Sequence, residues 1–322
     1  MSDPLVSVVL SVYNDATYLP AALESILAQE GVNVEVVAVD DGSTDKSPEI
    51  LASFARADAR VRVVRQENAG LTRALARGCA EARGELIARQ DADDLSRPGR
   101  LAKLAAVLVD EPKVAVAASW IELIGPRDEP LMTTRFPTGP EAGTRAVLEE
   151  RRSPIHGSAM FRKRDLEAVG GYRPEFYFAQ DSDLWFRLAD RGAFLFLPEP
   201  LYAFRVQAGS ITASHRPRQL ELYEIALACR AARLAGGLEA PLLEAAARIR
   251  PAPKGNAMAP VDDAASYFVG CALLARRDPR AVGYLVSHVR RKPLDPKGWI
   301  RLAQAMVRVK RSARNDGSRE PA

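Results

Sequence analysis

Short apolar segments alternate with amphipathic segments through the first 120 residues. Residues 5–12 and 34–39 are near-continuous β-rich runs, as expected for strands that are covered on both faces. Residues 17–30 place their apolar side chains at helical spacing. The alternation continues with predicted helices at 46–57, 70–82 and 97–109 and predicted strands at 61–65, 85–90 and 114–119. This order predicts an α/β fold with a doubly wound, mostly parallel sheet.

The pattern loosens after residue 120. Apolar segments at 121–124 and 131–136 flank a turn-rich stretch, which predicts a hairpin. Further predictions are helices at 141–150 and 180–188 and strands at 155–161, 194–197 and 201–206. From residue 216 the chain is rich in Ala, Leu and Arg with helical periodicity. We therefore expect a domain over 1–215 and a helical C-terminal extension over 216–322.

Charge separates these two parts. Residues 1–215 carry 25 Lys and Arg against 31 Asp and Glu, whereas residues 216–322 carry 20 against 10. The net charge of +4 is therefore a property of the extension, whose basic residues concentrate in 276–314. The two parts are expected to do different jobs.

Cysteine usage and hydropathy indicate an intracellular protein. The three cysteines are far apart and lack metal-ligand spacing, which is typical of a reducing compartment. The N-terminus lacks a signal-peptide pattern, and no stretch approaches the roughly 18 apolar residues of a spanning helix. We expect a cytoplasmic protein, with peripheral association at the inner face of the cell membrane left open.

Acidic side chains follow several predicted strands, where the ligands of open α/β sheets bind. Asp40 and Asp41 follow the second strand, and Asp91–Asp94 follow the fourth. In an extended segment Asp91 and Asp93 point the same way, so they can converge on one divalent cation. Such a cation, Mg²⁺ or Mn²⁺, needs few protein carboxylates when phosphate oxygens complete its shell. The alternative is a solvated acidic turn or a helix N-cap.

A bridging cation would make this acid-rich edge favourable for a diphosphate, because it neutralises charge on both sides. It would also stabilise the charge on a departing diphosphate. Asp41 could accept a hydrogen bond from a base or a ribose. Asp181, in the first turn of the helix at 180–188, could accept a proton from an incoming hydroxyl as general base.

Five motifs occur in a fixed order along the chain: Val6–Asn14, Val39–Asp45, Asn68–Leu71, Asp91–Asp94 with Pro98 and Arg100, and Gln180–Trp185. In this order and spacing the motifs resemble family 2 glycosyltransferases of the GT-A fold, of the bacterial surface-polysaccharide type. The resemblance covers about residues 4–212 and none of 216–322. It implies an inverting, metal-dependent transfer of a sugar from a nucleotide diphosphate donor.

The resemblance also implies roles for individual residues. It assigns the nucleoside to Ser11, Tyr13 and Asp41 with support from Asp40, the metal and diphosphate to Asp91 and Asp93, and the general base to Asp181. A UDP-sugar is the implied donor, with guanosine and thymidine diphosphate sugars left open. The implied acceptor is a hydroxyl of a glycan or a lipid-linked glycan.

Two positions depart from the family pattern. Gln180 stands where the family usually has Glu before the base, so one like charge that would raise the pKa of the base is missing. Leu75 stands where an Arg is usual, which leaves Arg73 or Arg77 as substitutes in the donor site. The signature and the membrane spans of processive synthases are absent from the sequence, so a single-addition enzyme is expected.

Four further residues carry hypotheses that each have a simple structural alternative. His156 could touch the diphosphate or the metal, or be an ordinary strand-end histidine. Trp185 could face the acceptor or belong to the core, and Arg205 could pair with phosphate or be a solvated edge-strand residue. Asp183 could replace Asp181 as the base, although helix geometry turns it about 200° away.

The basic extension carries an apolar stripe that includes Trp299, Leu302, Met306 and Val309. One interpretation is an interfacial helix that is attracted to an anionic membrane surface through 276–314. The other is a helix packed on the body with a solvated basic face. Nucleic acid is not an expected partner, because aromatic residues are not interleaved among the basic ones.

Other classes of protein fit the sequence less well. A nicotinamide oxidoreductase needs a glycine-rich turn after the first strand, and this chain has no glycine there. A sugar nucleotidyltransferase would have a glycine- and arginine-rich loop and a following Lys, which are also absent. A non-catalytic sugar-nucleotide binding module stays open because of Gln180.

Overall fold

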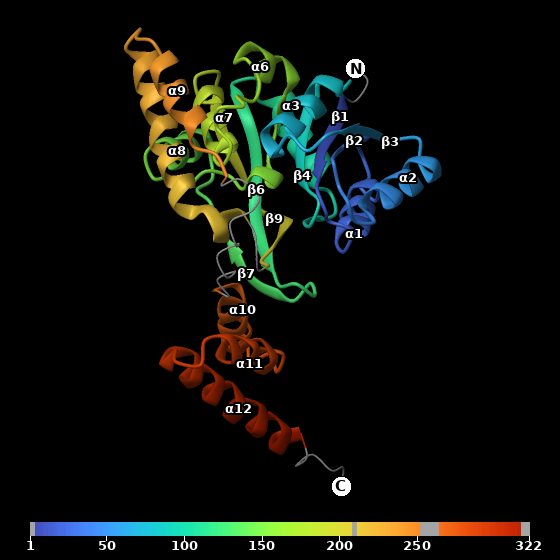
Figure 1. Cartoon of the computed structure of the whole chain (residues 1–322). Helices are drawn as coiled ribbons and strands as arrows, with labels where there is room; N and C mark the ends of the chain where they lie inside the picture. The colour runs from blue at the N-terminus through green and yellow to red at the C-terminus, as the bar shows by residue number, and fades with distance from the viewer. Residues whose placement is uncertain (1–3, 208–210, 252–263, 317–322) are drawn as a thin grey trace. The chain divides into compact units, whose positions relative to one another are not determined.

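The computed structural model describes residues 4–207, 211–251 and 264–316 (Figure 1), with side chains over 4–207, 215–251 and 264–308. These residues divide into two compact units. The first unit takes the described residues of 1–122, 133–204 and 217–252, and the second takes those of 123–132, 205–216 and 253–322. The division differs from the predicted boundary at 215, chiefly because 217–252 joins the first unit.

One nine-stranded sheet, in the order β3-β2-β1-β4-β8-β6-β9-β5, runs through the described residues, and β7 pairs with β6 off this path. Its parallel strands are β1 (Leu5–Val12), β2 (Asn33–Asp41), β3 (Val61–Gln66) and β4 (Leu86–Asp91). The other strands are β5 (Leu95–Ser96), β6 (Val114–Ile124), β7 (Pro130–Thr134), β8 (Met160–Arg162) and β9 (Ala193–Arg205). Antiparallel pairing joins β8 to β4 and β6, and β5 to β9. The predicted α/β class is confirmed, with antiparallel pairing in the second half of the sheet.

The strand β3, at the edge of the sheet, is mostly half-buried. Both faces of the other parallel strands are buried, which explains the near-continuous apolar sequence of β1 and β2. The helices that alternate with them are α1 (Leu19–Leu27), α2 (Ser47–Ala57), α3 (Leu71–Glu81) and α4 (Arg100–Asp110). Val8 and Leu10 of β1 point to one face and belong to one apolar cluster with residues of α1, α2 and α4. On the other face Val9 meets α3 at Gly78, where an added Cβ would lie 2.6 Å from Val9 Cγ1. The strand β1 therefore lies at the centre of the core.

Three predicted segments differ from the structure. The strand predicted at 155–161 is a 3₁₀ turn, η1 (His156–Ser158), followed by the short β8. The two strands predicted at 194–197 and 201–206 form the single strand β9, and α6 (Lys163–Ala168) has no counterpart in the prediction. Gly157 of this turn packs against Tyr202 of β9, because a Cβ added to it would lie 1.8 Å from Tyr202 Oη. Local hydrophobic periodicity does not contain such a contact.

The rest of the first unit is largely helical. Its remaining helices are α5 (Pro140–Leu148), α7 (Gln180–Leu188), α8 (Ile211–Leu234) and α9 (Ala240–Arg248). The backbone of α8 leaves helical geometry at His215. Beyond that point Leu222 and Cys229 of α8 share an apolar cluster with Phe176 and Phe186. This packing explains why the chain after 216 belongs with the first unit up to about residue 252.

The second unit is built mainly from three C-terminal helices. They are α10 (Ala264–Ala275), α11 (Ala281–Arg291) and α12 (Pro296–Asp316). Leu273, Leu285 and Leu302 bring one side of each helix into a shared apolar cluster. None of the helices within the described residues combines the length and apolar character that crossing a bilayer requires.

Candidate active site

Strand register brings the predicted residues of neighbouring strands to one edge of the sheet. Ser11 on β1 lies beside Asp91 on β4 and beside Val39 on β2. Asp41, the last residue of β2, lies beside Gln66 on β3. Because these strands are parallel, their carboxyl ends open onto the same edge. The structure therefore gathers the predicted nucleoside and metal residues.

Asp41 is buried, and its carboxylate organises the loop after β3. One oxygen accepts from Gln66 Nε2 at 2.7 Å and from the Ala69 N–H at 2.9 Å, and the other accepts from the Gly70 N–H at 2.9 Å. Gly70 has a φ of +88°, and a Cβ added there would lie 2.6 Å from the Tyr177 ring, so glycine is required. A carboxylate has about four acceptor positions. Three internal bonds therefore leave Asp41 able to accept a further bond from a ligand.

Asp40 holds the turn that follows β2. Its carboxylate accepts from the Ser43 N–H at 2.9 Å and pairs with Arg65 Nε at 3.1 Å. Asn14, just after β1, accepts from the Thr44 N–H at 2.8 Å and has a φ of +58°, a left-handed conformation that asparagine tolerates. The loops after β1 and β2 are thereby joined. Asp40 is itself fully buried, so it acts on the site by fixing backbone.

Side-chain exposure separates three candidates near this edge. Tyr13 is exposed in the loop after β1, and Arg73 is exposed in the first turn of α3. Both positions are accessible to a ligand. Leu75 is fully buried, so the position where relatives of the predicted family carry an Arg belongs to the core in this chain. Arg77 is exposed one turn after Arg73.

A buried arginine accompanies the acidic segment at the end of β4. Arg89 lies almost wholly inside the protein, and its Nη2 is 2.5 Å from Asp91 Oδ1. Although burial works against the charge, Asp91 raises the pKa of Arg89 above its usual value. The Asp91 N–H donates to Tyr202 Oη at 3.1 Å. Sequence reasoning missed Arg89, because it stands within a segment that looks like an ordinary buried strand.

Arg100, at the start of α4, fixes both ends of the acidic segment. It is fully buried, and burial lowers its pKa to about 10. Its guanidinium donates to Gln90 Oε1 at 3.1 Å, Ser96 Oγ at 2.8 Å, the Arg89 carbonyl oxygen at 2.7 Å and the Gly157 carbonyl oxygen at 2.5 Å. These four bonds connect the segments before and after Asp91–Asp94 with the 3₁₀ turn η1.

The pKa of Asp15 reports the electrostatics of this edge. Burial first, and then the charges of Asp93, Asp91 and Asp45, raise the pKa of Asp15 from 3.8 to about 7. A carboxyl group whose pKa is raised by neighbouring carboxylates marks an excess of negative charge. Asp91 and Asp93 therefore act together on the end of β1. Asp15 follows a predicted strand, and that position was the signal in the sequence that it belongs to the site.

This arrangement fits a Mg²⁺ or Mn²⁺ ion that shares its ligands with a diphosphate. Across residues 4–207, 215–251 and 264–308, no group of three or more His, Cys, Asp or Glu side chains is arranged to hold a metal ion unaided. Two carboxylates, those of Asp91 and Asp93, suffice when phosphate oxygens and waters complete the shell. A cation there would also relieve the negative charge that raises the pKa of Asp15.

Asp181 stands in the first turn of α7. Its Oδ1 accepts from the Ser182 N–H at 2.8 Å. Burial raises the pKa of Asp181, and the charge of Asp91 adds to the effect. The proposed base and the proposed metal residue are thus within electrostatic reach of each other. A carboxylate of raised pKa accepts a proton more readily than an ordinary one, which suits a general base.

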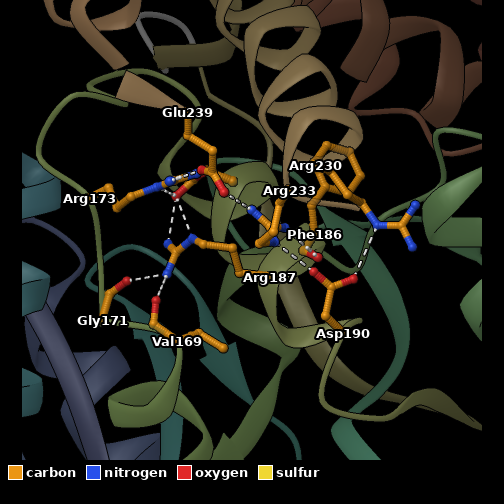
Figure 2. A network of polar contacts seen from close by, with 10 residues as sticks. Val169, Gly171, Arg173, Phe186, Arg187, Asp190, Arg230, Arg233 and Glu239 are labelled. Atoms are coloured by element: carbon orange, nitrogen blue, oxygen red, sulfur yellow. Dashed lines mark hydrogen bonds and ion pairs between the residues drawn. The ribbon is translucent and has the colours of Figure 1, made fainter. Parts of the chain in front are cut away.

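Asp183, two residues further along α7, is held in a network of ion pairs. Its Oδ1 accepts from Arg173 Nε at 3.0 Å, and its Oδ2 from Arg187 Nη2 at 2.6 Å. Figure 2 shows how the network continues from Arg173 to Glu239 and from there to Arg233. Both oxygens of Asp183 are engaged with guanidinium groups. This environment argues for a structural role and against Asp183 as an alternative base.

His156 and Trp185 lie inside the core. His156 Nε2 is 2.6 Å from Tyr172 Oη, and burial lowers the pKa of His156 well below its usual value, so the imidazole is neutral. Trp185 is fully buried and meets the His156 ring edge to face at a centroid distance of 5.6 Å. The hypothesis that Trp185 faces the acceptor is therefore wrong. Its periodic position after Asp181 reflects packing of α7 on the sheet.

Arg205, at the end of β9, belongs to the second unit. Its guanidinium donates to the Gly125 carbonyl oxygen at 3.1 Å and pairs with Asp128 Oδ1 at 2.7 Å. Arg205 is buried in these contacts. Arg205 thus contacts the turn at 125–128 between β6 and β7, and these contacts give no support to phosphate pairing.

Comparison with known sequences gives one family. A sequence profile described as "Glycosyl transferase family 2" matches residues 7–170. EpsH of Bacillus subtilis, which is named as a glycosyltransferase, is 30% identical over 235 residues, covering 71% of this chain and 67% of EpsH. The matched stretch contains every strand-end motif that supplies Ser11, Asp41 and Asp91.

Solved structures share the architecture of the chain. The mannosyltransferase PcManGT from Pyrobaculum calidifontis, solved with GDP-Man and Mn²⁺, aligns with a TM-score of 0.55 at 20% identity, over 99% of this chain and 89% of PcManGT. TarS 1–349 of S. aureus, solved with UDP-GlcNAc, aligns with a TM-score of 0.56 at 19% identity, over 97% and 92% of the two chains. At these identities the likeness shows a common fold.

Proposed function

The chain belongs to glycosyl transferase family 2 and is a glycosyltransferase of the GT-A fold, and from that premise we propose that it catalyses an inverting, metal-dependent, non-processive transfer. One sugar passes from a nucleoside diphosphate donor to a hydroxyl of a glycan or lipid-linked acceptor, in cell-surface polysaccharide biosynthesis. The observation that carries the proposal is that Asp41 and Asp91 end strands at one edge of the sheet, where Asp91 and Asp93 both act on Asp15 and the charge of Asp91 also reaches Asp181.

The donor is a nucleotide sugar, and we assign a UDP-sugar. Two solved structures of this fold hold nucleotide sugars, GDP-Man in one and UDP-GlcNAc in the other. In this chain Asp41 keeps an acceptor position after its three internal bonds. That position suits an N–H of the base or a ribose hydroxyl. The exposed ring of Tyr13 supports stacking on the base.

Asp91 and Asp93 would hold the divalent ion together with the diphosphate. A bound Mg²⁺ or Mn²⁺ supplies positive charge to the departing diphosphate. PcManGT was solved with Mn²⁺, which supports metal use in this fold. Arg89 pairs with Asp91, so it offsets one of the negative charges at this edge. Arg73 lies near the loop that Asp41 fixes and is the cation that we assign to the phosphate groups.

Asp181 takes the proton of the acceptor hydroxyl. The acceptor oxygen then bonds to the anomeric carbon of the sugar as the bond from that carbon to the diphosphate oxygen breaks. A single displacement of this kind inverts the anomeric centre. The raised pKa of Asp181 brings the base closer to the pH at which it works, which favours proton transfer.

The location of the reaction follows from the acceptor. We propose that the enzyme works on the cytoplasmic side, in peripheral contact with the inner face of the cell membrane, because a lipid-linked acceptor is anchored there. No helix of the described residues could cross a bilayer, so this contact would be a surface contact.

A non-catalytic nucleotide-sugar binding module is the second candidate. The observation in its favour is Gln180, which stands beside Asp181 where the family usually carries a Glu. Without that like charge beside it, the pKa of the base is raised less. The raised pKa of Asp181, due to burial and Asp91, favours the enzyme.

Release of nucleoside diphosphate from a panel of donor sugars, with Mn²⁺ or Mg²⁺, tests the proposal. The wild type should release the diphosphate from one donor class, and product analysis should show an inverted anomeric centre. Asp181→Asn should lower kcat by about 10²- to 10⁴-fold and keep donor binding. Asp110→Asn, an exposed acid at the end of α4, is the matched control and should be as active as wild type. Full turnover in Asp181→Asn would remove the base assignment, and donor binding without release in wild type would favour the binding module.

A further inference from the structure

An apolar face of α12 stays exposed within the second unit. Ile300 exposes 58% of its surface and Val307 51%, and Trp299 and Met306 are exposed to a similar degree. At about 100° per residue these four side chains and Ala303 fall within an arc of about 120°. The apolar stripe predicted from the sequence is therefore split, because its Leu302 faces inward.

A second apolar face explains how α12 is held. Leu302 and Ala305 are buried in the cluster with Leu273 and Leu285 of α10 and α11. They lie on a different arc from Ile300 and its neighbours. The exposed face is therefore not the face that the fold of the second unit uses. Packing of α12 within the second unit therefore does not explain why five apolar positions share one outward arc of the helix.

The turn before α12 extends the exposed apolar surface. Leu294 exposes 94% of its surface. The indole N–H of Trp299 donates to the Pro293 carbonyl oxygen at 2.8 Å, so the ring is fixed beside this turn with its polar atom satisfied. An exposed Trp ring of this kind suits the boundary between lipid headgroups and acyl chains.

The charge of residues 264–308 narrows the choice of ligand for this apolar surface. Residues 264–308 carry nine Lys and Arg and only two acids, Asp278 and Asp295. Both acids have partners: Asp278 pairs with Arg280 at 2.6 Å and Asp295 with His288 at 2.8 Å. The basic run 290–292 directly precedes Leu294. The second unit therefore presents an apolar patch within a strongly cationic segment.

Among the possible occupants, a lipid surface fits both properties. A second copy of the chain would bring the same cations face to face across a two-fold axis. Nucleic acid would use the cations but leave the aliphatic side chains of Ile300, Met306 and Val307 without a role. Anionic lipid headgroups attract the cations, and the acyl boundary accepts the apolar arc. Long Lys and Arg side chains can reach the headgroups from the adjoining arc of the helix.

We propose that Leu294 and the exposed face of α12 dock the second unit on an anionic lipid surface. We call this set, Leu294, Trp299, Ile300, Met306 and Val307, the lipid-docking face. The helix lies in the plane of the surface, and the basic run 290–292 lies at the headgroups. This inference gives a physical surface to the membrane contact of the proposed function, but it depends only on residues of the second unit.

Vesicle flotation of the full-length protein tests the inference. The wild type should float with vesicles of phosphatidylcholine and phosphatidylglycerol and much less with phosphatidylcholine alone, and salt should weaken the binding. Ile300→Ser with Val307→Ser should weaken binding by about tenfold or more, because two exposed aliphatic side chains no longer enter the lipid. Leu238→Ser with Val109→Ser, two exposed apolar residues of the first unit, should bind like wild type.

Tryptophan quenching by brominated lipid locates the contact. Quenching should occur in wild type and be lost in Trp299→Phe, because Trp185 is buried and the third tryptophan, Trp120, is half-buried in the first unit. Equal recovery with anionic and neutral vesicles, or binding unaffected by Ile300→Ser with Val307→Ser, would overturn the inference. The inference would also be overturned if the wild type bound no vesicles but formed a dimer or an RNA complex that this double variant dissociates. Turnover of a water-soluble acceptor analogue should be unchanged in the double variant, so failure of lipid docking and failure of the proposed transfer are distinguishable.

Discussion

Asp181 and Asp183 lie two residues apart on α7 and differ in what surrounds their carboxylates. Asp183 is saturated by Arg173 and Arg187. Asp181 accepts from its neighbour Ser182 and has its pKa raised by burial. Two acids with separate environments take separate roles, so we assign proton transfer to Asp181 and the anchoring of the helix to Asp183.

The pH dependence of turnover should report the raised pKa of Asp181. The base works only when it is deprotonated, so kcat should fall as pH drops through the raised pKa. That acidic limb should lie above the ordinary Asp range of about 4. Measurement of kcat against pH at saturating donor and Mn²⁺ checks this. A flat profile down to about pH 4 would contradict the assignment.

Asp15 gives a prediction for stability. Its folded-state pKa of about 7 is raised from 3.8, so protonation of Asp15 favours the folded state. That contribution is complete below about pH 4 and is lost as pH rises through about 7. Asp15→Asn, which resembles the protonated acid, should therefore raise the Tm at about pH 8 and leave it unchanged at about pH 4. Each kcal/mol corresponds to a shift of about 2–4 °C in a domain of about 150–250 residues.

Metal provides the control for this stability prediction. A divalent ion at Asp91 and Asp93 offsets the charge that raises the pKa of Asp15. Mg²⁺ with a nucleoside diphosphate should therefore reduce the difference in Tm between Asp15→Asn and wild type at about pH 8. Thermal unfolding with and without these ligands makes the comparison. An equal gain in Tm at both pH values would show that packing, rather than charge, is responsible.

Helix α7 is fixed from two sides. Arg187 donates to the carbonyl oxygens of Val169 and Gly171 at 2.8 and 2.7 Å. On the other side Arg173 pairs with Asp183 of α7. Glu239, between α8 and α9, in turn pairs with Arg173 and Arg233, as Figure 2 shows. The pairs with these two arginines keep the pKa of Glu239 below its usual value, although burial works in the opposite direction. Through Glu239 and Arg233, α8 and α9 thus help to hold α7, the helix that carries the proposed base.

Glu239→Gln tests this link. Loss of the charge should lower the free energy of unfolding by about 1–3 kcal/mol and loosen α7. We expect kcat to fall while the KM for the donor stays close to wild type, because the donor residues lie on other elements. Glu244→Gln, an exposed acid on α9, is the matched control. Loss of stability with an unchanged kcat and pH profile would limit Glu239 to a structural role.

The apolar pattern predicts the parallel strands and their helices well, because strands buried on both faces carry their signal in every residue. It fails where a remote contact decides the local structure. Gly157 of η1 packs against Tyr202, and its carbonyl oxygen accepts a hydrogen bond from Arg100. The acids of the site are visible in the sequence, since they follow strands. Arg89, the buried partner of Asp91, is not, since it stands within a segment that looks like an ordinary buried strand. Arg100 stands in a motif, but its bond to the distant Gly157 carbonyl oxygen is not visible in the sequence.

The chain joins an acid-rich unit to a cationic one. Periodicity alone identifies the helices after residue 216 but not what they pack against, and the phenylalanines at 176 and 186 bind α8 to the first unit. The second unit keeps α10, α11 and α12 around its own apolar cluster. Catalysis and lipid docking are therefore assigned to separate units. Variants of the lipid-docking face and of the acid-rich edge should each affect one property and spare the other.

Anomalous scattering from a crystal grown with Mn²⁺ and UDP is the decisive measurement. We expect one strong manganese peak about 2 Å from carboxylate oxygens of Asp91 and Asp93, next to the diphosphate. The base of UDP should lie at Asp41, and the β-phosphate should face Asp181. A diphosphate bound elsewhere, or a manganese ion that makes no contact with either carboxylate, would contradict this expectation.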